Sequence, residues 1–443
     1  MIETGARGKP ERAYLVAVEH ENDENMWSVE DSLDELASLA RTAGAEVVGK
    51  MIQRLRHPDV ATYLGKGKVQ ELSDLEKYLG FNLVIFDDEL SPSQQRNLEK
   101  ALNARVIDRT ALILDIFAQH AHTREGRLQV ELAQLEYRLP RLAGSGTEMS
   151  RLGGGSRGAA AGVGGAIGVR GPGETKLEID RRRIRGRISD LREEIESVRE
   201  ARQIHRRQRA EQAIPVVAVV GYTNAGKSTL FNVLTEASVV AENKLFATLD
   251  PMTRRVKLAG GQEILLTDTV GFLQHLPTTL VAAFRATLEE VTEADLLVHV
   301  VDASSPSMAR QIEAVEQVLE EIGAGGIPMI LALNKADLLP ADTLLEMPPL
   351  AATLPCVRVS ALNGTGGEEL LRCISDNLVA GFVPLDVLVP YSRGDLVALF
   401  HQYGTIDSET YDAAGTHLRG HMPANHSGPL LAFQQKAAKR MRA

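Results

Sequence analysis

Lys227 and Ser228 stand side by side at the end of a glycine-bearing loop, where an ammonium and a hydroxyl could act on a phosphate. They complete the pattern G-x-x-x-x-G-K-S, which begins at Gly221 after the apolar run 216–220 and precedes the helical stretch 229–234. Successive N–H groups of such a loop point at phosphates, the lysine reaches the outer phosphates and the serine hydroxyl ligates Mg²⁺. The N-terminus of the following helix also favours anions. We therefore predict a phosphate loop made of Gly221, Tyr222, Thr223, Asn224, Ala225, Gly226, Lys227 and Ser228.

A second motif of the pattern D-x-x-G follows another strand-like run, 263–267. The carboxylate of Asp268 can hold the Mg²⁺ shell through water, and Gly271 lets a backbone N–H approach the terminal phosphate. The pattern is weak alone, but it is strong when it follows a phosphate loop and a strand. The candidate residues are Asp268, Thr269, Val270 and Gly271.

Base recognition is predicted in two turns that follow the apolar runs 328–333 and 357–359. A carboxylate such as Asp337 can accept two hydrogen bonds from the N1–H and N2–H₂ edge of guanine, whereas adenine lacks that donor pair. The second turn can offer a backbone N–H to the guanine oxygen. The sequence therefore predicts GTP and GDP as the bound nucleotides. The candidate residues are Asn334, Lys335, Ala336, Asp337, Ser360, Ala361 and Leu362.

A switch loop is expected between the phosphate loop and D-x-x-G. Such a loop needs a threonine whose hydroxyl reaches Mg²⁺ in the triphosphate state. We assign this role to Thr248, with Thr253 as the alternative, so the predicted metal ligands are Ser228 and Thr248. The nucleotide-contacting residues of this stretch are Phe246, Ala247, Thr248, Leu249 and Asp250.

Phe272 occupies the position just after D-x-x-G, where many GTPases carry a glutamine that orients the attacking water. A phenyl ring cannot hydrogen-bond to water, so we predict slow intrinsic hydrolysis that a partner accelerates by ordering the loops around Thr248 and Gly271. Lys227, Mg²⁺ and backbone N–H groups then stabilise charge. Asn224 resembles the residue with which some GTPases coordinate K⁺ beside the phosphates, and a polar residue that only holds the loop backbone is the equal alternative.

The first part of the chain alternates short apolar runs with polar helical stretches, which favours an α/β unit with a parallel sheet. Strands are expected at 13–18, 47–52 and 83–86, and helices at 31–43 and 69–78. The same alternation resumes after residue 214.

Two stretches between these parts carry the narrow apolar seam of a coiled coil, and each seam needs a partner. We predict an antiparallel helical hairpin with the Gly-rich segment 144–173 at its tip, the alternative being two helices packed separately. The seam residues are Leu128, Leu132, Leu135, Leu139, Leu142, Ile184, Ile188, Leu191, Ile195 and Val198.

Four domains are therefore expected in this α/β protein. They are an N-terminal α/β domain over 1–110, a helical hairpin over 111–213, a P-loop GTPase domain over 214–380 and a small C-terminal α+β domain over 381–443. Strand-like segments in the last domain are 385–389 and 430–433.

Basic residues cluster at or just below the expected tip of the hairpin. Arginines contact phosphates and stack on unpaired bases, so the cluster predicts RNA contact. A solvated arginine-rich helix is the alternative, because Glu193, Glu194 and Glu196 lie close by in the sequence. The candidates are Arg151, Arg157, Arg170, Lys176, Arg181, Arg182 and Arg183.

Composition narrows the function classes further. The net charge of −10 excludes a generally nucleic-acid-binding surface, and only Cys356 and Cys373 are present, which excludes a disulfide framework and a cysteine-based zinc site. The longest apolar run is strand-sized, and no signal-peptide pattern is found. We expect a cytoplasmic monomer without a transmembrane segment and without a DNA partner, with peripheral attachment to a membrane as an open alternative.

The nucleotide motifs together resemble those of the translation-factor class of GTPases, and further motifs resemble the HflX family of ribosome-associated GTPases. The pattern R-G-P-G-E-T at 170–175 is specific to that family, while the longer Ala/Gly-rich tip around 153–165 departs from it. The similarity covers nearly the whole chain. The matching segments are 64–72, 86–88, 108–122, 171–180, 246–250 and 268–272.

This resemblance implies binding to the large ribosomal subunit near the peptidyl-transferase centre, and splitting or rescue of ribosomes under heat or other stress. Some members of the family are said to accept ATP as well as GTP. Another GTPase function, such as tRNA modification or membrane transport, and a nucleotide-gated RNA-binding module that rarely turns over are the alternatives. An ATP-driven remodeller is disfavoured because Gly65–Lys68 lacks the spacing of a phosphate loop.

Overall fold

The computed structural model describes residues 10–20, 28–142, 172–210, 214–235, 245–246, 248–258, 262–273, 285–340, 347–349, 351–380 and 382–434. The chain forms two compact units. The first comprises Met1–Arg199, Asn243–Asp250 and His275–Arg285, and the second comprises Glu200–Glu242, Pro251–Gln274 and Ala286–Ala443. A short segment between the phosphate loop and D-x-x-G thus belongs to the first unit.

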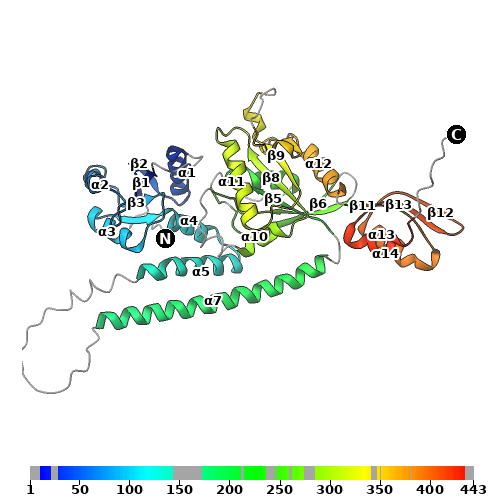
Figure 1. Ribbon diagram of the computed structural model, residues 1–443, viewed down its shortest axis with the longest axis horizontal. Coiled ribbons are helices and arrows are strands. Elements are labelled where there is room, and N and C mark those ends of the chain that lie inside the picture. The colour runs from blue at the N-terminus through cyan, green and yellow to red at the C-terminus, as the bar shows by residue number, and fades with distance from the viewer. Residues whose placement is uncertain are drawn as a thin grey trace, which may run out of the picture. The chain divides into compact units, whose positions relative to one another are not determined.

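The first unit begins with a four-stranded parallel sheet in the order β2-β1-β3-β4 (Figure 1). Every residue of β3 is buried, as expected of a central strand covered on both faces. A reciprocal capping box between Ser91 and Gln94 fixes the start of α3, and Pro92 suits its first turn. The predicted parallel α/β arrangement is confirmed. The elements are β1 Arg12–His20, α1 Val29–Thr42, β2 Glu46–Leu55, α2 Lys66–Leu79, β3 Leu83–Phe86, α3 Pro92–Leu102, β4 Arg105–Asp108 and α4 Arg109–His120.

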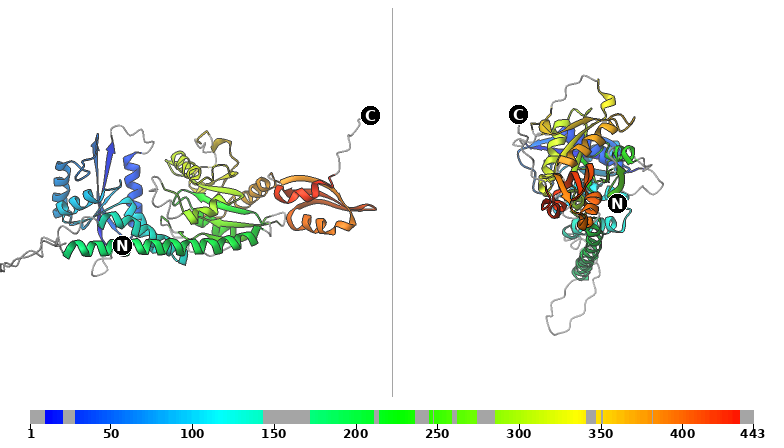
Figure 2. Two further views of the ribbon diagram at one scale, coloured as in Figure 1. Left: turned by 60° about the horizontal axis from the view of Figure 1, so that its bottom comes forward. Right: turned by 90° about the vertical axis from the view of Figure 1, so that its right-hand side faces the viewer.

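A helical hairpin follows, formed by α5 (Arg124–Arg141) and α7 (Pro172–Ala210). The two helices lie side by side with opposite chain directions (Figures 1 and 2). Eight of the ten predicted seam residues meet in one apolar cluster, so the hairpin is confirmed, but Leu142 and Val198 are not part of that cluster. The Gly-rich segment 144–173 lies outside the described residues except for its last two, Pro172 and Gly173, which begin α7, and proline is well suited to a first helical turn. The cluster contains Leu128, Leu132, Leu135, Leu139, Ile184, Ile188, Leu191 and Ile195.

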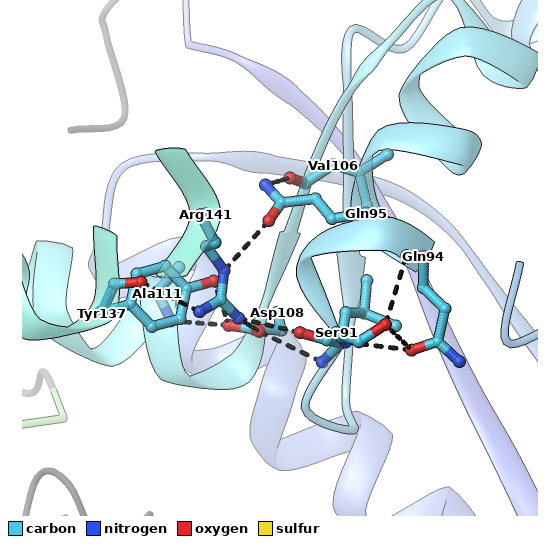
Figure 3. A network of polar contacts seen from close by, with 9 residues as sticks. Ser91, Gln94, Gln95, Val106, Asp108, Ala111, Tyr137 and Arg141 are labelled. Atoms are coloured by element: carbon cyan, nitrogen blue, oxygen red, sulfur yellow. Dashed lines mark hydrogen bonds and ion pairs between the residues drawn. The ribbon is translucent and has the colours of Figure 1, made fainter. Parts of the chain in front are cut away.

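The C-terminal end of α5 is anchored to the sheet by a buried ion pair (Figure 3). Asp108, at the end of β4, accepts hydrogen bonds from the Tyr137 hydroxyl and from the Arg141 guanidinium, each at 2.9 Å. Arg141 stacks on the Tyr137 ring and also donates to the Leu90 carbonyl oxygen and to Gln95 Oε1. Burial raises the pKa of Tyr137, so its hydroxyl stays a donor. These contacts fix α5 to the α/β sheet.

A six-stranded sheet in the order β10-β9-β8-β5-β7-β6 forms the centre of the second unit, and only the edge strand β6 is antiparallel to its neighbour. Apolar side chains on one face pack against α8 and α12, and those on the other face pack against α11. Helices therefore cover both faces, as a parallel sheet requires. The elements are β5 Val216–Gly221, α8 Lys227–Thr235, β6 Met252–Lys257, β7 Glu263–Asp268, α10 Arg285–Thr292, β8 Leu296–Asp302, α11 Met308–Glu321, β9 Met329–Asn334, η2 Ala336–Leu338, η3 Ala351–Thr353, β10 Cys356–Arg358 and α12 Gly367–Ala380.

The last part of the second unit is a three-stranded antiparallel sheet, β11-β13-β12, with two helices on its apolar face. The predicted strand over 385–389 is confirmed within β11. The predicted strand over 430–433 is wrong, because Leu430 and Leu431 end helix α14; a short apolar run does not distinguish the two structures. The elements are β11 Phe382–Val389, η4 Tyr391–Arg393, α13 Gly394–Tyr403, β12 Thr405–Asp412, β13 Gly415–Pro423 and α14 Ala424–Leu431.

No helix in the described ranges is long and apolar enough to cross a membrane. The two compact units do not decide the four domain boundaries expected from the sequence, which stay a prediction.

Candidate nucleotide site

The predicted nucleotide motifs converge on one edge of the six-stranded sheet. The segments 221–228, 268–271 and 334–337 begin at the last residues of β5, β7 and β9, and the segment 360–362 follows β10. These four strands all belong to the parallel part of the sheet. In such sheets ligands bind outside the carboxyl ends of the strands, where the strand order reverses. Here the chain runs from β5 to β7 on one side and then to β8 on the other. The reversal therefore lies at the phosphate loop.

The backbone of the phosphate loop restricts which residues it can contain. Gly221 has a φ of 146°, and an added Cβ would lie 2.3 Å from the Val300 carbonyl oxygen. Gly226 has a φ of 96°, and an added Cβ would lie 2.2 Å from Asn334 Nδ2. Only glycine fits either position. The exposed Asn224 has a φ of 61°, a left-handed conformation in which asparagine is enriched.

The Lys227 ammonium is buried against this loop and donates to the Tyr222 carbonyl oxygen at 2.8 Å. Burial lowers the pKa of Lys227 to about 8, and the Asp268 carboxylate partly opposes the shift. A buried cation gains stability from a nearby anion. The position of Lys227 therefore suits a phosphate ligand.

Ser228 and Asp268 meet next to this lysine. The Ser228 hydroxyl donates to Asp268 Oδ2 at 2.7 Å, and Asp268 is buried. A hydroxyl and a carboxylate are hard oxygen donors of the kind that Mg²⁺ prefers, so these two residues fit the ion. Gly271 lies against the phosphate loop: an added Cβ would be 2.9 Å from Lys227 Nζ and 2.8 Å from Thr223 Cγ2. A side chain at 271 would thus displace the phosphate loop.

The aromatic ring of Phe272 is only 1% exposed, so it lies in the core and not at the surface of the site. The Phe272 N–H donates to the Gly221 carbonyl oxygen at 3.1 Å, and the Thr223 N–H donates to the Phe272 carbonyl oxygen at 2.8 Å. These hydrogen bonds tie the D-x-x-G loop to the phosphate loop. The sequence indicates that the phenyl ring cannot hydrogen-bond to water, but it does not indicate that the Phe272 backbone pairs with the phosphate loop.

The turns predicted to hold the base are joined by side chains of their own motifs. Asn334 Nδ2 donates to the Ala225 carbonyl oxygen at 2.7 Å, and the Ala361 N–H donates to Asn334 Oδ1 at 2.9 Å. The Ser360 hydroxyl donates to Asp337 Oδ1 at 2.6 Å, which orients the carboxylate. One buried amide thus connects the phosphate loop to both turns. Leu362 is 83% exposed at the end of the second turn.

Two residues of this region were not predicted from the sequence. Asp302, the last residue of β8, forms an ion pair with Lys335 at 2.6 Å. The sequence could have indicated Asp302, because it is an acidic residue at the end of a strand that is parallel to β5. His299 is buried within β8, and burial together with the nearby Lys227 charge lowers its pKa to about 3, so it is neutral. A lone histidine in an apolar run gives no such signal.

The predicted switch residues Phe246, Thr248, Leu249 and Asp250 belong to the first unit and not to the unit that carries the phosphate loop. Ala247 lies outside the described residues. Thr253, the alternative to Thr248, lies in β6, and its hydroxyl is 3.0 Å from that of Thr267 in β7.

The predicted RNA contacts are only partly described. Arg182 and Arg183 are exposed on α7, and Arg181 is half-buried there. Lys176 lies in α7, while its side chain and the residues Arg151, Arg157 and Arg170 lie outside the described part. Further along α7, Glu194 pairs with Arg187 at 3.2 Å, so part of the acidic and basic charge on this helix is mutually neutralised.

The sequence matches three protein families in succession. Residues 30–118 match the family described as GTP-binding GTPase N-terminal, residues 120–209 match GTP-binding GTPase Middle Region, and residues 216–335 match 50S ribosome-binding GTPase. The last family covers the phosphate loop, D-x-x-G and the start of the base-recognition turn.

Known proteins are similar over nearly the whole length. A protein of Lacrimispora saccharolytica named GTPase HflX is 46% identical over 414 residues, which cover 94% of this chain and 94% of that protein. Its namesake from Caldanaerobacter subterraneus subsp. tengcongensis is 47% identical over 414 residues, 94% of this chain and 91% of that protein. Among solved structures, a GTP-binding protein from Sulfolobus solfataricus in complex with GDP is 25% identical, covering 83% of this chain and 98% of that one, with a TM-score of 0.44.

Proposed function

Since this chain belongs to the HflX family of P-loop GTPases and is a GTP hydrolase, we propose that it binds the large ribosomal subunit and splits or rescues ribosomes under stress. In this function the protein hydrolyses GTP to GDP and phosphate. The supporting observation is that the phosphate loop, D-x-x-G and both base-recognition turns lie at one edge of the six-stranded sheet. The same chain has a helical hairpin with exposed arginines.

Ser228 and, in the triphosphate state, the Thr248 hydroxyl are the proposed Mg²⁺ ligands, and Asp268 would hold the shell of the ion through water. The ion would neutralise charge on the outer phosphates. Lys227 and the Gly271 N–H stabilise the charge that develops during phosphoryl transfer. The room that Gly271 leaves beside Lys227 Nζ supports this arrangement.

Asp337 is proposed to select guanine by accepting both donors of its N1–H and N2–H₂ edge. Ser360 holds that carboxylate, and the Ala361 N–H is already oriented by Asn334. A site built around these acceptors rejects a base that lacks the donors. GTP and GDP are the proposed ligands, with use of ATP a secondary expectation from the family.

Slow intrinsic hydrolysis follows from Phe272. Its ring is buried in the core, and it brings no hydrogen-bonding group to the attacking water. The ribosome is the proposed activator, acting by ordering the segment around Thr248. The Asn224 side chain leaves two alternatives open: it coordinates K⁺ beside the phosphates, or it only holds the left-handed turn.

The tip of the hairpin is the proposed probe of ribosomal RNA. Arginines at the surface of α7 can contact RNA phosphates and stack on unpaired bases. The candidates remain Arg151, Arg157, Arg170, Lys176, Arg181, Arg182 and Arg183. We further propose a cytoplasmic monomer, with peripheral membrane attachment as the alternative location.

Steady-state GTP turnover with and without purified large ribosomal subunits, in potassium buffer, tests this function. Strong stimulation is expected, and replacement of K⁺ by Na⁺ should slow turnover only if Asn224 holds the ion. Tight GTP binding without stimulation would remove the ribosome as activator. That result would favour the second candidate, a nucleotide-gated RNA-binding module, which the buried Phe272 ring also suits.

A further inference from the structure

Residues 243–250 lie between α8 and β6 in the sequence, yet they are part of the first compact unit. Leu245, Phe246 and Leu249 are buried there, with Leu249 only 1% exposed. The Phe246 ring meets the Phe117 ring of α4 nearly edge-on, with centroids 4.7 Å apart. The segment is therefore packed into one unit, while the chain continues from both of its ends into the other.

The carboxylate of Asp250 lies at the first turn of α5. Its Oδ2 accepts hydrogen bonds from the backbone N–H groups of His122 and Thr123 at 2.9 and 2.8 Å, and its Oδ1 accepts from the Thr123 hydroxyl. Thr123 is also the N-cap of α5, because its Oγ1 accepts from the Gly126 N–H at 3.0 Å. One hydroxyl thus caps the helix and holds the switch carboxylate, so each contact supports the other.

Gly126 makes room for that carboxylate. An added Cβ would lie 2.4 Å from Asp250 Oδ1 and 3.2 Å from Thr123 Oγ1. Glycine otherwise weakens a helix relative to alanine. The close approach of Asp250 explains why a glycine stands in the first turn of α5.

Helix α5 is also one of the two helices of the hairpin, and its first turn lies at the base of the hairpin. Its C-terminal end is fixed to the sheet through Arg141 and Asp108, and its apolar seam packs against α7. A displacement of the hairpin that strains α5 therefore acts on the contact at the other end, between Thr123 and Asp250.

We propose that Asp250 is a positioning residue for GTP hydrolysis. Its contact with Thr123 ties the segment that carries Thr248 to the base of the hairpin, and docking of the hairpin on the ribosome changes the rate of hydrolysis through this contact. The inference rests on the proposed function and names the contact by which the large subunit regulates the nucleotide site. Asp250 acts through Thr123 and not on the reacting phosphate.

Gly126→Ala in the full chain tests the inference, because it displaces the carboxylate without removing it. Gly186→Ala is the matched control, since the space around Gly186 on α7 is open. In Gly126→Ala the ratio of kcat with and without large subunits should fall at least about tenfold, in the range of measured couplings between sites. KM for GTP should stay within about twofold, since the nucleotide contacts remain. Gly186→Ala should keep the wild-type ratio.

Two further variants keep the test independent of folding defects. Thr123→Val removes the shared hydroxyl and should lower the ratio as Gly126→Ala does, whereas Thr123→Ser retains the hydroxyl and should restore it. Hydrogen exchange at the Thr123 amide, which donates to Asp250, should be faster in Gly126→Ala than in wild type.

The outcomes separate the two proposals. Wild-type protein that the large subunit does not stimulate would overturn both the proposed function and this coupling. Wild-type stimulation in Gly126→Ala, with the Thr123 amide exchanging faster, would overturn the coupling alone. Loss of stimulation in Gly126→Ala and Thr123→Val, but not in Thr123→Ser or Gly186→Ala, would establish it.

Discussion

The nucleotide edge of the second unit and the start of α5 in the first unit hold their carboxylates in different ways. Asp268 and Asp337 accept hydrogen bonds from Ser228 and Ser360, hydroxyls that belong to neighbouring motifs of the same edge. Asp250 instead accepts from backbone groups 127 and 128 residues away in the sequence. The first arrangement lies within the proposed nucleotide site, whereas the second joins residues of the first unit that are far apart in the sequence. Substitutions at the nucleotide edge should therefore change GTP turnover or base selection, whereas substitutions at the start of α5 should change the proposed coupling to the hairpin.

Lys227→Ala should have the largest effect, and this effect should be on the rate of GTP hydrolysis. The kcat should drop about 10²–10³-fold, because a preorganised charge beside the transferring phosphate is lost. Steady-state hydrolysis at saturating GTP measures it. Lys257→Ala is the control, because Lys257 lies on β6 with its side chain 77% exposed. A drop of less than about tenfold would mean that Lys227 does not stabilise the transition state.

Asp337→Ala should affect base selection next most strongly. Losing two hydrogen bonds to a charged group, about 1.5–3 kcal/mol each, should reduce the preference for GTP over ATP by at least about 100-fold. Competition binding with the two nucleotides measures the ratio. Ser360→Ala should give a smaller loss, since it leaves the carboxylate and removes only the hydroxyl that orients it. An unchanged ratio in Asp337→Ala would place guanine recognition elsewhere.

Asp250→Asn should lower the stability of the first unit by about 1 kcal/mol. The amide keeps the shape, but it loses the charge that strengthens the hydrogen bonds at the start of α5 and interacts with the helix dipole. Urea unfolding followed by circular dichroism measures the change, with the exposed Asp190→Asn on α7 as the control. Equal stability of Asp250→Asn and wild type would show that this carboxylate is not needed to hold residues 245–250 in the first unit.

The nucleotide edge could be predicted because its signals are local. Each motif directly follows a short apolar run, and parallel strands bring their carboxyl ends together. The strand over 83–86 was predicted with its observed ends, since it is apolar throughout and bounded by polar residues. The hairpin could be predicted for a similar reason: two seams of equal spacing require each other, and HflX-like motifs flank them.

What escaped prediction depends on contacts between distant residues. The assignment of 246–250 to the nucleotide stays a prediction, but the contact of Asp250 with Thr123 could not be inferred from the sequence, because the two residues lie far apart in it. Phe272 was interpreted by its missing hydrogen-bonding group, but its backbone pairs with the phosphate loop. The strand expected over 430–433 failed because local apolar character does not distinguish a helix end from a strand.

The ion pair between Glu131 and Arg187 should give the smallest effect and tests how far the hairpin acts as one body. Arg187 donates two hydrogen bonds to the Glu131 carboxylate, at 2.8 and 2.9 Å, and thereby lowers the pKa of Glu131. Because the Arg187 and Glu131 side chains are 41% and 43% exposed, the pair should contribute only about 0.2–1 kcal/mol at neutral pH. A double-mutant cycle with Glu131→Gln and Arg187→Gln, monitored by urea unfolding, measures the coupling.

The lowered pKa of Glu131 predicts how the coupling energy between Glu131 and Arg187 changes with pH. A carboxyl group whose pKa is lower in the folded state stabilises that state above its unfolded pKa, and the contribution is lost as the pH falls through the folded value. The coupling should therefore be full at neutral pH and disappear in acid, below the normal range of a glutamate. Glu193→Gln, at an exposed position of α7, is the control variant. A coupling that persists in acid would mean that the apolar seam, and not the charges, connects α5 to α7, and a force on the tip would then reach Thr123 without the ion pair.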